Sequence, residues 1–131
     1  MLKVVLDTNV IISAALSPKG KPAETFKIIT SNNDIELSYN EIIFAEYKRV
    51  FSYERLNIPS EKQKEFLEAI KDEGIVREPI TSDILLPDES DRIFYDTAKT
   101  VNAYLITGNI KHYPSENFIL TPAQFLDLLS L

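Results

Sequence analysis

The chain has 131 residues, of which 44% are hydrophobic, and its net charge is −6. This length fits one compact domain over residues 1–131, and the absence of cysteine excludes disulfides, thiolate metal sites and a cysteine nucleophile. The acidic charge argues against a broad basic face for nucleic acid, but carboxylates gathered around a metal ion would also make a nucleic-acid enzyme acidic. No basic segment followed by a long apolar core opens the chain, so we expect a soluble cytoplasmic protein with no membrane contact.

The first predicted element is a buried strand that ends in a polar turn. Val4–Leu6 is apolar and partly β-branched, and Asp7, Thr8 and Asn9 separate it from a second apolar run, Val10–Leu16. A strand that leads directly into a helix is the first half of a βα unit. Ligands of open parallel sheets bind beyond the carboxyl ends of the strands. Asp7 therefore stands where a carboxylate can do chemistry, although these polar residues could also simply cap the helix.

The remaining sequence alternates predicted helices and strands. Helices are expected near residues 23–30, 41–53, 61–72, 88–102 and 122–129, and strands near 35–38, 75–76, 104–107 and 118–120. Ser60 is a plausible cap for the helix that Gly74 ends, and Thr121 is the expected cap of the last helix. This alternation implies a parallel sheet covered on both faces. The predicted fold is a three-layer α/β/α sandwich with a central parallel sheet.

Glu46 is an acidic residue in a position that a helix normally gives to an apolar side chain. On the predicted helix it shares a face with Ile42 and Ile43. A carboxylate in an apolar stripe is costly unless it is paired, protonated or bound to a metal. An ion pair with Arg49, or a place at the edge of the stripe, would explain Glu46 without any function.

Asp91 has a similar place on the helix predicted to open at Asp88. It lies on the side of Phe94, which should pack on the sheet. The spacing Asp88-x-x-Asp91 is also that of a capping pair at a helix start. Asp96 lies roughly 140° around the helix from Asp91 and is expected to be solvated or to support the site from behind.

A fourth candidate follows the strand predicted at residues 104–107. Gly108 permits a tight turn or the close approach of a ligand. Asn109 can be a turn residue or a helix cap, and it can also offer a neutral oxygen to a metal or an amide to a phosphate. Lys111 and His112 bring positive charge to the same strand end, and His112 is more simply read as a loop residue than as a catalytic base.

Taken together, these positions resemble the PIN-domain family, nucleases that include the VapC-like toxins of bacterial and archaeal toxin–antitoxin systems. The resemblance covers nearly the whole chain and rests on Val5–Ile11, on Leu37-Ser38 followed by Glu46, on Asp88–Arg92 and on Ala103–Asn109. It implies that Asp7, Glu46 and Asp91 are catalytic and bind Mg²⁺ or Mn²⁺. Thr8 matches the family's Thr or Ser neighbour of the first aspartate. A frequent fourth acid is replaced by Asn109, also counted as catalytic, so the chain looks like a branch with TGN in place of TGD.

The resemblance implies a Mg²⁺- or Mn²⁺-dependent endoribonuclease that hydrolyses RNA phosphodiester bonds as the toxin of a toxin–antitoxin system. The implied partners are RNA, a cognate antitoxin and a second copy of the chain in a homodimer. The candidates for RNA contact are Lys19, Lys21, Lys48, Arg49, Arg92 and Lys111. The alternative is a catalytically weak or inactive PIN-like domain that binds protein or RNA, and Asn109 leaves this alternative open.

Overall fold

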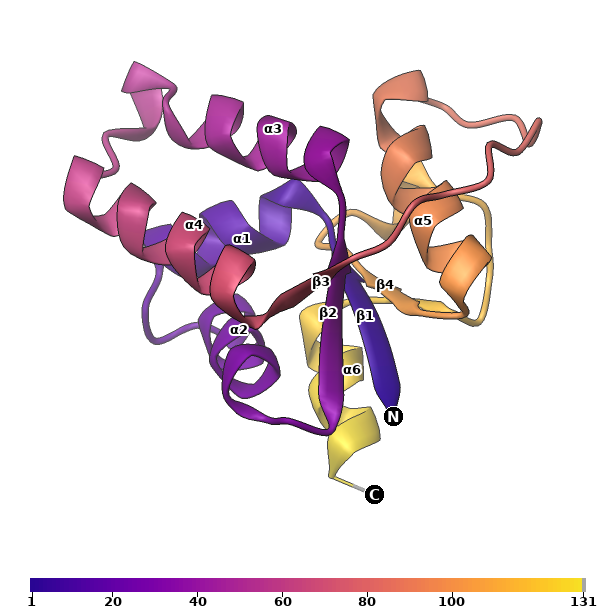
Figure 1. Cartoon of the computed structure of the whole chain (residues 1–131), viewed down its shortest axis with the longest axis horizontal. Coiled ribbons are helices and arrows are strands. Elements are labelled where there is room, and N and C mark those ends of the chain that lie inside the picture. Colours follow the sequence, from indigo (N-terminus) through magenta and orange to yellow (C-terminus); the bar gives the residue numbers. More distant parts are fainter. Residues whose placement is uncertain (131) are drawn as a thin grey trace.

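A parallel β-sheet forms the centre of the computed structural model, which describes residues 1–130 (Figure 1). Its strands are β1 (Leu2–Leu6), β2 (Ile35–Tyr39), β3 (Gly74–Val76), β4 (Tyr104–Ile106) and β5 (Ile119–Leu120). They lie in the order β3-β2-β1-β4-β5, and every neighbouring pair is parallel. The first strand of the chain is therefore the middle strand of the sheet, and β1 and β4 end side by side.

Helices cover both faces of this sheet. They are α1 (Thr8–Leu16), α2 (Lys21–Ser31), α3 (Glu41–Phe51), α4 (Ser60–Glu73), α5 (Arg92–Val101) and α6 (Pro122–Leu129). Helices α1 to α4 lie on one side of the sheet, α5 packs on β1 and β4 from the other, and α6 packs on α2 (Figure 1). The predicted three-layer α/β/α fold is confirmed. Within residues 1–130, no helix combines the length and the hydrophobicity that a membrane span requires.

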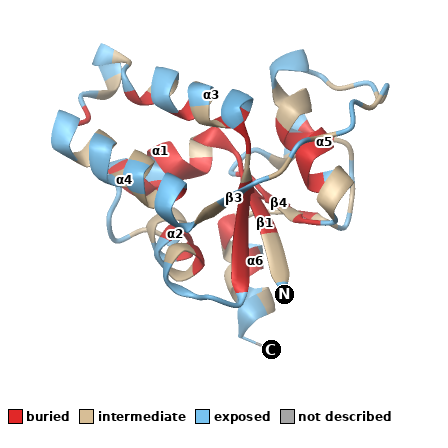
Figure 2. Cartoon of the chain, viewed as in Figure 1, coloured by how far each residue is buried: buried red, intermediate tan, exposed pale blue. Residues whose placement is uncertain are grey.

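The core surrounds β1, as its sequence predicted. Val4, Val5 and Leu6 are fully buried, and buried residues cluster along the central strands and the inward helix faces (Figure 2). Tyr47 of α3 is also fully buried, and its hydroxyl donates to the Leu6 carbonyl oxygen at 2.5 Å. This bond ties α3 to the carboxyl end of the central strand, where the polar turn begins.

Helix boundaries follow the predictions where local chemistry sets them. The last helix begins with a capping box, in which Thr121 Oγ1 accepts from the Gln124 amide and the Gln124 side chain accepts from the Thr121 amide. The prediction that Ser60 caps its helix is wrong. Ser60 is the first residue of α4, Pro59 occupies the cap position, and no side chain caps this helix within residues 1–130. The helix predicted over residues 88–102 is split into a 3₁₀ turn, η2 (Glu89–Asp91), and α5.

Gly74 joins α4 to β3 at a point with no room for a side chain. A Cβ there would lie 2.4 Å from the Ile70 carbonyl oxygen and 2.7 Å from the Tyr39 ring. We expect Gly74→Ala to lower the free energy of unfolding by about 1–3 kcal/mol, because backbone must move to relieve the overlap. Urea unfolding measures this loss. Gly20→Ala is the matched control, since its Cβ would come no closer than 3.4 Å to another residue, and equal losses in the two variants would contradict the packing argument.

Candidate functional site

Asp7 lies at the end of β1 and is held by side chains from the far end of the sequence. The residue occupies the N-cap position of α1, but the helix has no side-chain cap there, so the capping interpretation is wrong. Only 6% of Asp7 is exposed. Its Oδ2 accepts from Thr107 Oγ1 at 2.9 Å and from the Tyr113 hydroxyl at 2.8 Å. The carboxylate is therefore fixed at the carboxyl edge of the sheet, between β1 and β4.

Glu46 reaches the same edge from α3. Thr8, the first residue of α1, donates its hydroxyl to Glu46 Oε2. The other oxygen, Oε1, lies 3.7 Å from the Arg49 guanidinium, whose side chain is 59% exposed. Ile42 is 64% exposed, so the prediction that it belongs to the buried apolar stripe of this helix is wrong. Glu46 consequently lies at the edge of the buried face of α3. The exposed pair with Arg49 is a weak partner, whereas the bond from Thr8 joins Glu46 directly to the turn after β1.

Asp91 ends the short turn η2 and occupies the N-cap position of α5, where its side chain makes no cap hydrogen bond within residues 1–130. Its neighbour Asp88 is the capping residue, with Oδ1 accepting from the Ser90 amide at 3.0 Å, so the idea of a capping pair is wrong for Asp91. The Asp91 side chain is 14% exposed. Its Oδ2 is buried and has no hydrogen-bond partner among the described residues 1–130, and His112 Nδ1 lies 3.7 Å from it. A buried, unpartnered carboxylate oxygen is costly and calls for a cation.

These acids lie close enough together for their negative charges to raise the pKa of Asp91. Burial raises the pKa of Asp91 to about 6, and the negative charges of Asp7, Asp88 and Glu46 add to the increase. Burial also raises the pKa of Asp7, although hydrogen bonds from Tyr113 and other donors oppose it. Within residues 1–130, no three acidic or histidine side chains lie close enough to form a ready-made metal cage. Repulsion between like charges opposes their closer approach.

Asn109 follows β4 at the same edge. Its backbone amide donates to Thr107 Oγ1 at 3.0 Å, and its side chain does not cap the following 3₁₀ turn, η3 (Ile110–His112). The Gly108 amide donates to Asn9 Oδ1 at 2.9 Å, and a Cβ on Gly108 would lie 3.3 Å from that oxygen. The close approach predicted at Gly108 is therefore made to Asn9 within the chain. The exposed Asn109 stands beside it at the strand end.

Sequence reasoning did not single out Tyr113, which the structure places among the acids. The residue is 6% exposed, and its hydroxyl bonds to Asp7. Burial raises the pKa of Tyr113, and the negative charges of Asp7, Asp91 and Glu46 raise it further. The phenol is therefore a neutral hydrogen-bond donor at any physiological pH. The only signal in the sequence was an aromatic residue soon after the TGN turn.

The predicted roles of Asp96 and Arg92 change because both side chains hydrogen-bond to Ser82. Asp96, predicted to be solvated or supporting, is 3% exposed and accepts from the Ser82 amide at 3.0 Å and from its hydroxyl at 2.5 Å. Arg92, a candidate for RNA contact, donates to the carbonyl oxygens of Ser82 at 2.8 Å and Ile84 at 2.5 Å. Both side chains thus hold the loop before η2 against α5, and neither is free for a ligand.

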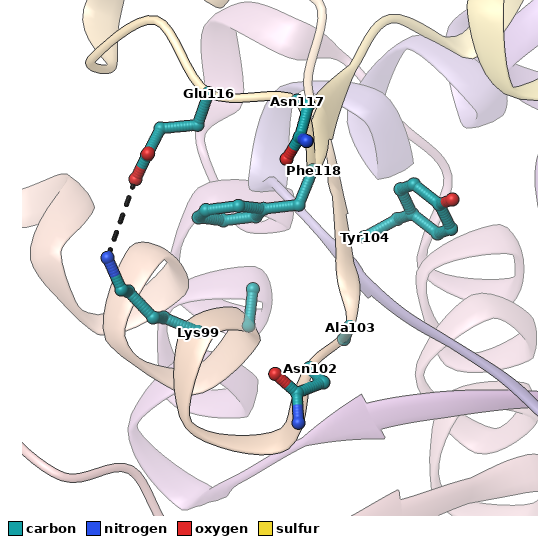
Figure 3. Close-up of a pocket in the computed structure, with 8 residues that line it drawn as sticks. Lys99, Asn102, Ala103, Tyr104, Glu116, Asn117 and Phe118 are labelled. Carbon is teal, nitrogen blue, oxygen red and sulfur yellow. Dashed lines mark ion pairs between the residues drawn. The ribbon is translucent and has the colours of Figure 1, made fainter.

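A cavity of about 620 Å³ lies away from the acids. It is lined by the end of α5, the start of β4 and the segment before β5, including Tyr104 and Phe118 (Figure 3). Lys99 Nζ and Glu116 Oε2 face each other at 3.7 Å on its rim. Because these residues lie near the amino ends of β4 and β5, the cavity is at the opposite end of the strands from Asp7, which follows the carboxyl end of β1.

Comparisons with known proteins agree with this fold. No curated protein sequence matches the chain. The structure is similar to a chain in the crystal structure of VapBC2 from Rickettsia felis bound to a DNA fragment from their promoter, with a TM-score of 0.61 and 18% sequence identity over 91% of this chain and 97% of the other. Residues 3–111 match the family model of the PIN domain. The match covers most of the sequence and includes Asp7, Glu46 and Asp91, and the chain belongs to the PIN-domain family.

Proposed function

We propose that this protein is a metal-dependent endoribonuclease that hydrolyses RNA phosphodiester bonds. Its active site would be formed by Asp7, Glu46 and Asp91. The observation that carries the proposal is the buried Oδ2 of Asp91, which has no hydrogen-bond partner in the part of the chain that the structure describes and lies near the negative charges of Asp7 and Glu46. Such a concentration of negative charge is unfavourable unless a cation offsets it. Membership of the PIN-domain family, whose members are generally nucleases, supports the same conclusion.

The donor set fits a hard divalent cation. Asp7, Glu46 and Asp91 offer only carboxylate oxygens, which suit Mg²⁺ or Mn²⁺ and do not favour softer metals. These three residues would hold the ion. When bound, it would supply a water of lowered pKa and positive charge for the phosphoryl oxygens.

The chain's own polar residues would orient these ligands and the substrate. The Thr8 hydroxyl fixes one oxygen of Glu46, and the other lies 3.7 Å from the Arg49 guanidinium. The exposed Asn109 can offer its side-chain amide to a phosphate at the end of β4. Lys111 and His112 are exposed on the adjoining turn, where positive charge would attract the RNA backbone despite the acidic total charge.

Metal removal tests this function. We expect the purified chain to cleave members of a broad RNA panel with Mn²⁺ or Mg²⁺, to stop when EDTA is added, and to resume when excess Mn²⁺ is supplied. Gel analysis of end-labelled RNA measures the cleavage, and the Asp7→Asn variant, purified in the same way, gives the background. Cleavage that survives both EDTA and this substitution would come from a contaminant and would refute the assignment.

We also propose that the protein is a cytoplasmic toxin that pairs with an antitoxin and forms a homodimer. Support comes from the structural likeness to a chain of the VapBC2 complex. Expression of the chain alone should arrest growth, and co-expression of a small protein encoded beside it should relieve the arrest. If no RNA in the panel is cut while that neighbour co-purifies, a binding module replaces the nuclease as the better assignment.

A further inference from the structure

The first and the last residue of the segment Thr107–Tyr113 both hydrogen-bond to Asp7. Thr107 is fully buried at the end of β4, and its amide donates to the Leu120 carbonyl oxygen at 2.9 Å, which ties this end of the segment to β5. Tyr113 closes the other end, after η3. Both hydroxyls donate to the same atom, Asp7 Oδ2, at 2.9 and 2.8 Å.

The second carboxylate oxygen of Asp7 is treated differently. Among residues 1–130, no side chain donates a hydrogen bond to Asp7 Oδ1. An oxygen that accepts two hydroxyl bonds has its lone pairs engaged, whereas the other oxygen accepts no side-chain bond within residues 1–130. The Thr8 backbone amide also donates to this carboxylate. The same segment also brings His112 to within 3.7 Å of Asp91, so it contacts two of the proposed metal ligands.

We propose that Tyr113 is a positioning residue of the metal site: together with Thr107 it fixes the Asp7 carboxylate so that Oδ1 is the oxygen left for a divalent cation. The inference rests on the proposed function, because it assumes that Asp7 binds the metal. Groups that hydrogen-bond to a metal ligand fix its orientation, and their loss typically weakens metal binding about 10–100-fold. The hydroxyl can be tested apart from the ring, because phenylalanine would fill the same buried space.

The experiment measures Mn²⁺ binding directly, without any RNA. Isothermal titration with Mn²⁺ compares the wild-type chain with Tyr113→Phe and with Tyr104→Phe. Tyr104 is the matched control, because it lines the cavity at the end of the sheet opposite to Asp7 (Figure 3). We expect Tyr113→Phe to bind Mn²⁺ about tenfold more weakly and Tyr104→Phe to bind within about twofold of the wild type. Thermal unfolding in EDTA checks that the weaker binding does not reflect unfolded protein.

The possible failures are distinguishable. Wild-type Mn²⁺ binding that Tyr113→Phe leaves unchanged would overturn the positioning role and leave the proposed function standing. Absence of Mn²⁺ binding by the wild type would remove the metal site itself, and this inference with it. If Tyr113→Phe does not fold, Thr107 tests the same oxygen: Thr107→Val should weaken Mn²⁺ binding and Thr107→Ser should retain it, and equal binding by the two would contradict orientation by hydroxyls.

Discussion

Replacement of Asp7 by asparagine is expected to reduce Mn²⁺-dependent RNA cleavage by at least about a thousandfold, which is about 4 kcal/mol of transition-state stabilisation. The substitution removes one negative charge from the proposed metal site and replaces a carboxylate oxygen by an amide nitrogen, which cannot coordinate a cation. The shape of the side chain is retained, and one oxygen remains to accept from Thr107 and Tyr113. The variant should therefore stay folded while it loses activity.

Asp127→Asn provides the matched control for this variant. Asp127 is an exposed residue of α6, so its replacement makes the same chemical change on the surface and should leave the cleavage rate within about twofold. Initial rates on a fluorescent RNA at saturating Mn²⁺ measure both variants, and circular dichroism verifies their folding. A folded Asp7→Asn protein that kept a tenth of the wild-type rate would show that Asp7 does not hold the metal.

The fold was predictable because its main determinants are local in the sequence. The apolar run at Val4–Leu6 is buried on both faces, as a central strand of a parallel sheet must be. The capping box at Thr121 lies within four residues and sets the start of α6. The interruption at Asp91 was not predictable, because the loop before it is held by Ser82, whose partners Arg92 and Asp96 lie 10 and 14 residues away.

The candidate site shows the same division between local and distant chemistry. Asp7 stood out because it directly follows a buried strand, where open parallel sheets bind their ligands. Glu46 stood out because an acid is unusual beside apolar residues. The role of Tyr113 could not be read in this way. Its hydroxyl meets a carboxylate 106 positions earlier in the chain, a contact that exists only because β4 pairs with β1. A single sequence shows that Tyr113 is present, but it does not show that β4 pairs with β1.

Asp91→Asn is expected to stabilise the metal-free protein while abolishing its activity. The pKa of Asp91 is raised from 3.8 to about 6 in the folded chain, so folding disfavours the charged form. Well below pH 4 the carboxyl is largely protonated in both the folded and the unfolded state and costs nothing. As the pH rises, the unfolded state ionises first, the cost to the folded state grows between pH 4 and 6, and it is constant above that. This pKa difference corresponds to about 3 kcal/mol at most, and partial access to water reduces it to about 1–2 kcal/mol.

Urea unfolding in EDTA at two pH values measures this effect. At pH 8 the free energy of unfolding of Asp91→Asn should exceed that of the wild type by about 1–2 kcal/mol, and at pH 4 most of the gain should be absent. Asp88→Asn is the contrasting control, because hydrogen bonds from Ser90 lower the pKa of Asp88 and its loss should give no gain. Both variants carry the same total charge, so a gain shared by both would reflect reduced overall repulsion. A gain confined to Asp91 at high pH would mean that the protein keeps a destabilising carboxylate where the proposed metal ion would bind.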